Sequence, residues 1–151
     1  MPCINVLHVE DDPDDAFFLA RAFSRTHPVC SVQRVAKGEE ALEYLEGIGP
    51  YADRQAHPFP DLVVLDLKLP GLSGFEVLEW VRGQEGLKGL PIVVLSGSWL
   101  DEDRQKAETL GASGYLVKSC LYSDIAEEVL RLVPRTRQCP PNDQFKTDLA
   151  A

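Results

Sequence analysis

The sequence predicts an α/β protein with a single parallel sheet, and three observations support this fold class. Short runs of strand length alternate along the chain with stretches in which apolar residues recur at helical spacing. Two of the runs, 62–65 and 92–95, contain only Val, Leu and Ile, which is typical of central parallel strands buried on both faces. Five strands and five helices in alternation fit one domain of 151 residues with right-handed crossovers.

Each element is assigned from its own residues, in chain order. The predicted strands are four to six residues long and comprise 4–9, 31–35, 62–65, 92–95 and 114–118. The first helix begins at Asp12 and Pro13, a capping acid followed by a proline suited to the first turn. A weakly patterned fourth helix spans 100–110. The apolar residues with helical spacing in the other helices are Ala16, Leu19, Ala20 and Phe23, then Ala41, Leu42 and Leu45, then Val77, Leu78 and Val81, and finally Tyr122, Ile125, Ala126, Val129, Leu130 and Val133.

Two stretches lack any helical or strand period. Residues 47–60 hold two glycines and three prolines, and we expect them to form a long surface loop. Residues 134–151 follow the last apolar stripe and are predicted to be a C-terminal tail, mobile unless a partner orders it. The sequence therefore predicts one folded domain over residues 1–133 and no second domain.

The charge balance argues against several classes of function. Asp and Glu number 24 against 15 Lys and Arg, giving a formal charge of −9, so neither nucleic acid nor an anionic membrane is an expected partner. No apolar run approaches the ~18–20 residues of a membrane span, and the start of the chain lacks the pattern of a signal peptide. The four cysteines form no Cys-x-x-Cys pair, which argues against a zinc or dithiol site. A cytoplasmic location is expected.

Polar residues follow the predicted strands at the place where a ligand site is expected. In an open parallel sheet, ligands bind beyond the carboxyl ends of the strands, where the strand order reverses. With the order 2-1-3-4-5, the first and third strands are neighbours, so Glu10, Asp11 and Asp66 would lie together. Ser96 and Lys118 follow the fourth and fifth apolar runs beside them.

This combination predicts phosphorylation of a carboxylate. Three carboxylates in close contact repel one another, so a cation is expected among them, and hard oxygen ligands open to water suit Mg²⁺. A carboxylate can attack phosphorus as a nucleophile, while a metal ion and the ammonium of Lys118 neutralise the phosphoryl oxygens. Asp12, Asp14 and Asp15 are interpreted instead as helix caps and solvated loop acids.

Four motifs in a specific order and spacing resemble those of a known family. They are VEDD at 9–12, LDLKLPGLSG at 65–74, VLSG at 94–97 and GASGYLVK at 111–118. Over residues 3–133 the sequence resembles a receiver domain of a two-component response regulator. The resemblance implies a flavodoxin-like, doubly wound (βα)5 fold with a five-stranded parallel sheet.

The resemblance assigns the phosphoacceptor and the metal ligands. Asp66 would accept a phosphoryl group from a sensor histidine kinase. Asp11 would bind Mg²⁺ directly, and Glu10 would act on the ion largely through water. The backbone carbonyl of Lys68 would be the third protein ligand, with Asp66 itself in the same metal site.

The resemblance also assigns the response to phosphorylation. Ser96 would donate a hydrogen bond to the phosphoryl group, Lys118 would pair with it, and Tyr115 would turn inward as an aromatic switch. No output domain is expected after the receiver domain, so the signal would pass through protein contacts or through onward transfer of the phosphoryl group. Only self-phosphorylation and slow autodephosphorylation are expected, so we do not expect a multiple-turnover enzyme.

Further features resemble the single-domain receivers associated with bacterial phytochromes. They are EDDPDD at 10–15, the long loop before Pro60, and Ser119 after Lys118, where the wider family usually has proline. They imply a bacteriophytochrome as the kinase and a homodimer through the last helix, the adjoining strand and the C-terminal segment. Lys68 is predicted to obstruct the hydrolytic water and to lengthen the phosphorylated state.

Two alternative functions remain open on the sequence. One is a binding module that keeps the receiver fold without phosphorylation; Ser119 favours it, whereas the retained acids, serine and lysine oppose it. The other is a flavin carrier or an enzyme on the same fold. A flavin carrier needs a phosphate cradle where Glu10 and Asp11 stand, and a phosphatase of the aspartyl-phosphate class needs a second aspartate where Lys68 stands.

Overall fold

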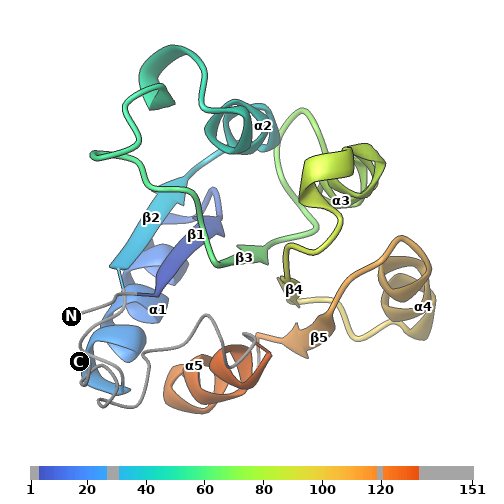
Figure 1. Ribbon diagram of the computed structural model, residues 1–151. Coiled ribbons are helices and arrows are strands. Elements are labelled where there is room, and N and C mark those ends of the chain that lie inside the picture. The colour runs from blue at the N-terminus through green and yellow to red at the C-terminus, as the bar shows by residue number, and fades with distance from the viewer. Residues whose placement is uncertain (1–3, 27–30, 119–120, 133–151) are drawn as a thin grey trace, which may run out of the picture.

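A computed structural model of the chain contains one five-stranded parallel sheet with helices on both faces (Figure 1). The strands lie in the order β2-β1-β3-β4-β5, which confirms the predicted fold class and its flavodoxin-like topology. The structure describes residues 4–26, 31–118 and 121–132. The predicted tail at 134–151, Ser119 and all four cysteines lie outside these residues.

The elements follow the predicted alternation of strands and helices. The strands are β1 (Asn5–Val9), β2 (Ser31–Val35), β3 (Leu62–Leu65), β4 (Ile92–Ser96) and β5 (Gly114–Val117). The helices are α1 (Pro13–Thr26), α2 (Gly38–Glu46), α3 (Gly74–Gly83), α4 (Asp101–Thr109) and α5 (Tyr122–Arg131). None of the helices in the described part of the chain is long and apolar enough to span a membrane.

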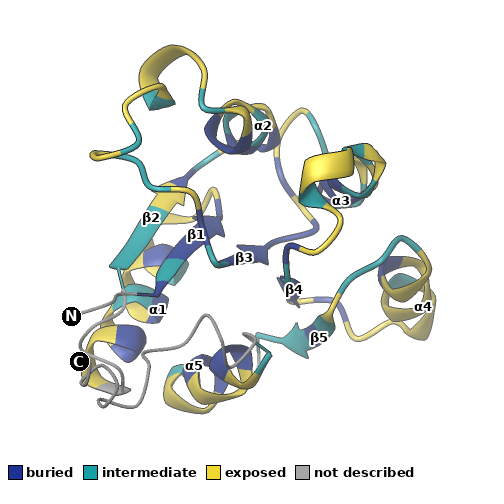
Figure 2. Cartoon of the chain, viewed as in Figure 1, coloured by how far each residue is buried: buried dark blue, intermediate teal, exposed yellow. Residues whose placement is uncertain are grey.

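The central strands separate two apolar clusters, one on each face of the sheet. Val63 and Leu65 pack with α2, α3 and α4, whereas Leu62 and Val64 pack with α1 and α5. Because successive side chains of a strand point to opposite faces, a strand covered on both sides needs apolar residues at every position. This explains the unbroken apolar runs in the sequence. Figure 2 shows β3 and β4 buried and the edge strands β2 and β5 more exposed.

Arg54 and the Tyr44 hydroxyl, which donates to the carbonyl of Pro58 at 2.9 Å, hold the predicted surface loop at 47–60 against the domain. Arg54 donates hydrogen bonds to the carbonyl oxygens of Tyr44, Leu45 and His57 at 2.8–3.2 Å. The loop also contains a short 3-10 helix at Gly49–Tyr51, which is too short to produce a sequence period. The arginine therefore joins the loop to the C-terminal end of α2.

Candidate functional site

The acids that follow β1 and β3 meet at the carboxyl end of the sheet. β1 and β3 are paired with Val9 opposite Leu65, so the residues that follow each strand emerge side by side. One carboxylate oxygen from each of Glu10, Asp11 and Asp66 lies within 4.8 Å of the others. Glu10 and Asp66 are 1% and 6% exposed, whereas Asp11 is open to solvent. The structure thus brings together the three acids that the strand order placed there.

Lys118 reaches this cluster from the end of β5. Its Nζ donates hydrogen bonds to Glu10 Oε1 at 2.8 Å and to Asp66 Oδ2 at 3.2 Å. A third hydrogen bond, at 3.0 Å, goes to Oδ2 of Asp15 in the first turn of α1. The backbone N–H of Lys118 also donates to the carbonyl of Ser96, which holds the end of β5 beside β4.

Burial and crowding perturb the protonation of the cluster. Burial raises the pKa of Glu10 to about 7, an effect that the charge of Asp66 increases and the hydrogen bond from Lys118 opposes. Burial lowers the pKa of Lys118, but the hydrogen bond to Glu10 and the charge of Asp66 outweigh it, so the net shift is upward. The ammonium of Lys118 carries one positive charge, which does not balance the carboxylates of Glu10, Asp15 and Asp66 that it contacts.

The donor set of this cluster fits Mg²⁺. Oxygen ligands with one side open to water are what Mg²⁺ prefers, because it keeps several of its own waters. Glu10, Asp11 and Asp66 supply carboxylate oxygens and no nitrogen or sulfur, and Asp11 supplies the open side. A divalent ion would also relieve the repulsion between Glu10 and Asp66 that raises the pKa of Glu10.

Backbone contacts hold the two acidic loops in place. Arg34 of β2 donates to the carbonyl oxygens of Glu10 at 2.9 Å and Asp11 at 3.0 Å. After β3, the N–H of Gly74 donates to the carbonyl of Leu67 at 2.9 Å. A Cβ atom at Gly74 would lie 2.2 Å from the carbonyl oxygen of Asp66, so only glycine fits there. Arg34 could not be recognised from the sequence, because an arginine in an edge strand carries no distinctive signal.

Lys68 presents its backbone and its side chain to different surroundings. Its backbone N–H donates a hydrogen bond to Asp66 Oδ1, with nitrogen and oxygen 3.3 Å apart. Its side chain is exposed. The position two residues after Asp66 thus lies at the mouth of the site. The roles assigned to the Lys68 carbonyl and side chain stay predictions.

Ser96 and Tyr115 are joined through the loop between β4 and α4. Ser96 ends β4 and is fully buried, and its Oγ accepts a hydrogen bond from the N–H of Ser98 at 3.2 Å. The Tyr115 hydroxyl donates to the carbonyl of Ser98 at 3.1 Å, so the ring is already turned inward and buried. Ser98 also donates through its own Oγ to Asp103 of α4. Ser98 was not singled out from the sequence because a loop serine is too common to be informative.

The interpretation of Asp15 as a solvated acid is wrong. Its side chain is only 29% exposed, and it accepts hydrogen bonds from Lys118 and from the hydroxyl of Tyr122 at the start of α5. Asp12 does cap the helix, because its Oδ1 accepts the N–H of Asp14 at 2.9 Å. Asp15 lies in the first turn of α1, where an acid is favourable through the helix dipole alone, so its position in the sequence gave no signal of these partners.

His8 lies in β1 beneath the acids and is a buried core residue. Burial lowers its pKa to about 3, so it is neutral, and Nε2 lies 3.9 Å from Glu10 Oε1. Neither ring nitrogen has a hydrogen-bond partner among the described residues. His8 therefore contributes no charge to the cluster.

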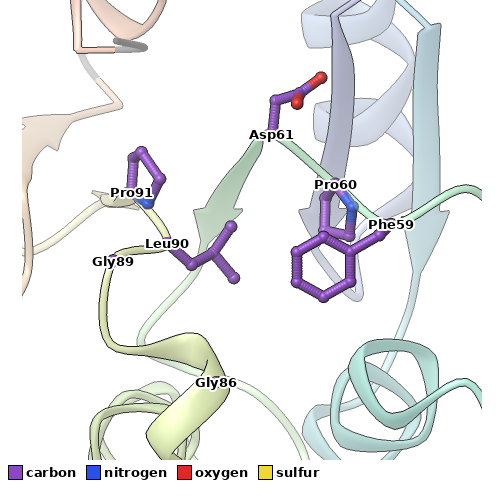
Figure 3. A pocket seen from close by; sticks show the side chains of 7 residues that line it. All are labelled: Phe59, Pro60, Asp61, Gly86, Gly89, Leu90 and Pro91. Atoms are coloured by element: carbon purple, nitrogen blue, oxygen red, sulfur yellow. The ribbon is translucent and has the colours of Figure 1, made fainter. Parts of the chain in front are cut away.

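A separate hollow lies at the amino ends of β3 and β4, at the opposite end of the strands (Figure 3). Phe59, Pro60, Leu90 and Pro91 contribute most of its lining side chains, and Asp61 is its single charged residue. Asp61 Oδ2 accepts the N–H of Asn5 at 2.8 Å, which is a structural contact. Among the described residues, the group of acids that could hold a metal ion lies at the carboxyl end of the sheet, away from this hollow.

Comparison with known families agrees with this site. The family model of the response regulator receiver domain matches residues 6–130, so the chain belongs to this family. The chain is 34% identical over 127 residues to the probable methanogenesis regulatory protein FilR2 of Methanothrix harundinacea, covering 82% of this chain and 77% of that protein. It is 28% identical to the Arabidopsis thaliana response regulator ARR15, covering 82% of this chain and 60% of that protein.

Several solved structures of phytochrome response regulators are similar over most of their length. The phosphorylated cyanobacterial phytochrome response regulator RcpA has a TM-score of 0.79 at 31% identity, covering 91% of this chain and 99% of that chain. A response regulator in red light signaling of R. palustris has a TM-score of 0.78 at 31% identity, covering 93% of this chain and 99% of that chain.

Other curated relatives are much longer than the matched region. The chain spans 24% of the chemotaxis protein CheV2 of Helicobacter pylori and 50% of the nitrate/nitrite response regulator NarL of Escherichia coli. The match to such proteins is a match of the receiver domain.

Proposed function

We propose that this receiver domain accepts a phosphoryl group on Asp66 from a sensor histidine kinase, in a Mg²⁺-dependent reaction. The observation that carries the proposal is the position of the Asp66 carboxylate. Its oxygens lie in one cluster with those of Glu10 and Asp11, and its Oδ2 accepts a hydrogen bond from the ammonium of Lys118 at 3.2 Å. Membership of the receiver family supports the same reaction.

Each residue of the site would have a defined part in the transfer. An oxygen of the Asp66 carboxylate attacks phosphorus, the P–O bond forms, and the P–N bond to the kinase histidine breaks, with the imidazole leaving. Lys118 neutralises charge on the phosphoryl oxygens, and the Ser96 hydroxyl donates a hydrogen bond to one of them. Glu10, Asp11, Asp66 and the carbonyl of Lys68 would hold Mg²⁺, which would supply further positive charge at the phosphoryl oxygens.

The reaction produces a phosphorylated domain, which then slowly hydrolyses its own phosphoryl group. The protein would therefore act as a switch and not as a multiple-turnover enzyme. Tyr115 would report the state of Ser96 to the surface around α4, β5 and α5. The signal would then pass to a partner through protein contacts. The hydrogen bond of Tyr115 to the Ser98 carbonyl supports this route, because Ser98 also contacts Ser96.

A phytochrome-type histidine kinase is the partner that we propose. The similarity to solved phytochrome response regulators over nearly their whole length supports it. We also propose a homodimer through α5 and β5, since β5 is an edge strand and Leu116 on it is partly exposed. Sedimentation with and without beryllofluoride, a mimic of the phosphoryl group, measures this assembly directly.

Acetyl phosphate with Mg²⁺ tests the central reaction. The wild-type chain should gain an acid-labile phosphate, and Asp66→Asn should gain none because the nucleophile is lost. Asp14→Asn is a matched control, since Asp14 is an exposed acid at the start of α1, and it should be labelled as the wild type is. Failure of the wild type to be labelled, or labelling of Asp66→Asn, would contradict the proposal.

The alternative function is a receiver fold that binds partners without being phosphorylated. Ser119, in place of the usual proline after Lys118, is the observation that favours it. Titration with Mg²⁺ separates the two functions, because a site that no longer supports phosphorylation should not bind the ion.

A further inference from the structure

Asp15 connects Lys118 to α5 and is not one of the three clustered acids, which are Glu10, Asp11 and Asp66. Its Oδ2 accepts a hydrogen bond from Lys118 Nζ at 3.0 Å, and its Oδ1 accepts one from the Tyr122 hydroxyl at 2.9 Å. Both carboxylate oxygens are therefore occupied by partners on β5 and α5. Asp15 itself lies on α1, so three elements meet at this carboxylate.

Phosphorylation would affect the three hydrogen bonds of Lys118 differently. An ammonium group has three hydrogens, and they point to Glu10, Asp66 and Asp15. Asp66 receives the phosphoryl group, and Glu10 belongs to the cluster that would surround the metal ion. Asp15 takes part in neither event, so its contact is the one that can remain unchanged throughout the reaction.

A lysine side chain needs such a fixed contact to be aimed. Its four-carbon chain is flexible, and ordering it costs rotamer entropy. Asp15 is well suited to the task because its own orientation is set by Tyr122. The Tyr122 ring in turn packs against the ring of Phe18 of α1, with centroids 5.9 Å apart and the ring planes tilted by 31°. The Asp15 carboxylate is thus held from two sides.

The protonation of the pair agrees with a lasting ionic contact. Burial raises the pKa of Asp15, but the hydrogen bonds from Lys118 and Tyr122 outweigh burial, so the net shift is downward. Burial and the hydrogen bond to Asp15 raise the pKa of Tyr122 to about 12, so the tyrosine stays a donor. Asp15 remains a carboxylate and Tyr122 a phenol near neutral pH.

We propose that Asp15 is a positioning residue for phosphorylation: it aims the ammonium of Lys118 at the phosphoryl group, and Tyr122 orients Asp15. This inference rests on the proposed function of Asp66. In the phosphorylated state the phosphoryl oxygens take the place of Asp66 on Lys118, and the hydrogen bond to Asp15 persists. Asp15 therefore assists phosphoryl binding and does not compete with it.

Binding of beryllofluoride in the presence of saturating Mg²⁺, measured by calorimetry on the full chain, tests this role. Asp15→Asn should weaken binding about tenfold, the order expected when one charge-assisted hydrogen bond is lost. Tyr122→Phe should weaken it less, because Asp15 keeps its charge and loses only its orientation. Asp14→Asn makes the same change of charge one residue away and should leave the affinity within about twofold of wild type.

Titration with Mg²⁺ alone distinguishes positioning from support of the fold. A positioning residue acts through Lys118, so the Mg²⁺ affinity of Asp15→Asn should equal that of Asp14→Asn. Equal losses of Mg²⁺ and beryllofluoride affinity would overturn the inference, as would unchanged or tighter beryllofluoride binding by Asp15→Asn. Failure of the wild-type chain to bind beryllofluoride would instead count against the phosphorylation of Asp66 itself.

Discussion

The two helices that flank the fifth strand are attached to the domain in different ways. α5 contributes four buried side chains to one apolar cluster, namely Ile125, Ala126, Val129 and Leu130. α4 contributes one buried side chain, Ala107, to the other. The loop before α4 leaves Trp99 and Leu100 exposed by 73% and 58%. Apolar packing holds α5 on the domain. α4 has less apolar packing, and hydrogen bonds from Ser98 to Asp103 and from Tyr115 to Ser98 help to hold its N-terminal end.

This difference indicates which side of the site can move. Segments with few buried apolar contacts open at a lower free energy than the core. The α4 side carries Ser96, Ser98 and Tyr115, while the α1 and α5 side carries Asp15 and Tyr122, which hold Lys118. We infer that the α5 side is the fixed support of the site and that rearrangement on phosphorylation occurs on the α4 side.

The largest expected effect is a difference in stability between substitutions on the two sides. Ile125→Ala should lower the free energy of unfolding by about 2–4 kcal/mol, because it leaves a cavity in the α1–α5 cluster. Leu100→Ala removes an exposed side chain and should change it by less than about 0.5 kcal/mol. Urea unfolding followed by circular dichroism measures both. Equal losses in the two variants would remove the basis of the comparison.

Substitution of Gly74 tests how closely α3 must approach the backbone of Asp66, the residue that lies between the α4 side and the α5 side. Gly74→Ala should lower the free energy of unfolding by about 1–3 kcal/mol, because its Cβ would overlap the backbone of Asp66 and Leu67. It should also slow labelling by acetyl phosphate, since the loop that carries the phosphoacceptor must shift. Gly83→Ala, at the other end of α3, adds a Cβ where the structure has open space and serves as control. Normal stability and labelling of Gly74→Ala would contradict this account.

Removal of one tyrosine hydroxyl on each side tests whether the α4 side and the α5 side respond independently. Tyr115→Phe removes the hydrogen bond to the Ser98 carbonyl and should cost about 1 kcal/mol. Amide hydrogen exchange should become faster in α4 and stay unchanged in α5. Tyr122→Phe is the matched variant, and its effect should be confined to α1 and α5. Faster exchange in both helices of Tyr115→Phe would show that the two sides do not respond independently.

The smallest expected effect concerns hydrolysis at the mouth of the site. The exposed side chain of Lys68 is predicted to obstruct the attacking water, so Lys68→Ala should lose its phosphate faster than wild type without a change in stability. The decay of acid-labile phosphate after removal of acetyl phosphate gives this rate. Lys88→Ala is a control for loss of a surface charge, since Lys88 pairs on the surface with Glu85. An unchanged rate in Lys68→Ala would remove this role.

Much of the site could be predicted because it depends on strand order. Glu10, Asp66 and Ser96 come directly at the ends of buried apolar runs, and parallel strands bring their carboxyl ends to one edge. Asp15 could not be assigned in the same way. An acid in the first turn of a helix is favourable through capping and the helix dipole alone, so its presence does not reveal a partner. Tyr122 has the spacing of a core residue, and only the packing of α5 against α1 turns its hydroxyl toward Asp15.

The order of strands and helices, the buried faces of β3 and β4, and the group of acids with a lysine at one end of the sheet were all determined by the sequence itself. They follow from local periodicity and from the geometry common to all parallel sheets. The partners of individual side chains were decided by the tertiary structure: Lys118 with Asp15, Arg34 with the acidic loop, and Ser98 with Tyr115. Such contacts join residues far apart in the chain, and their distances are set only when the helices pack on the sheet.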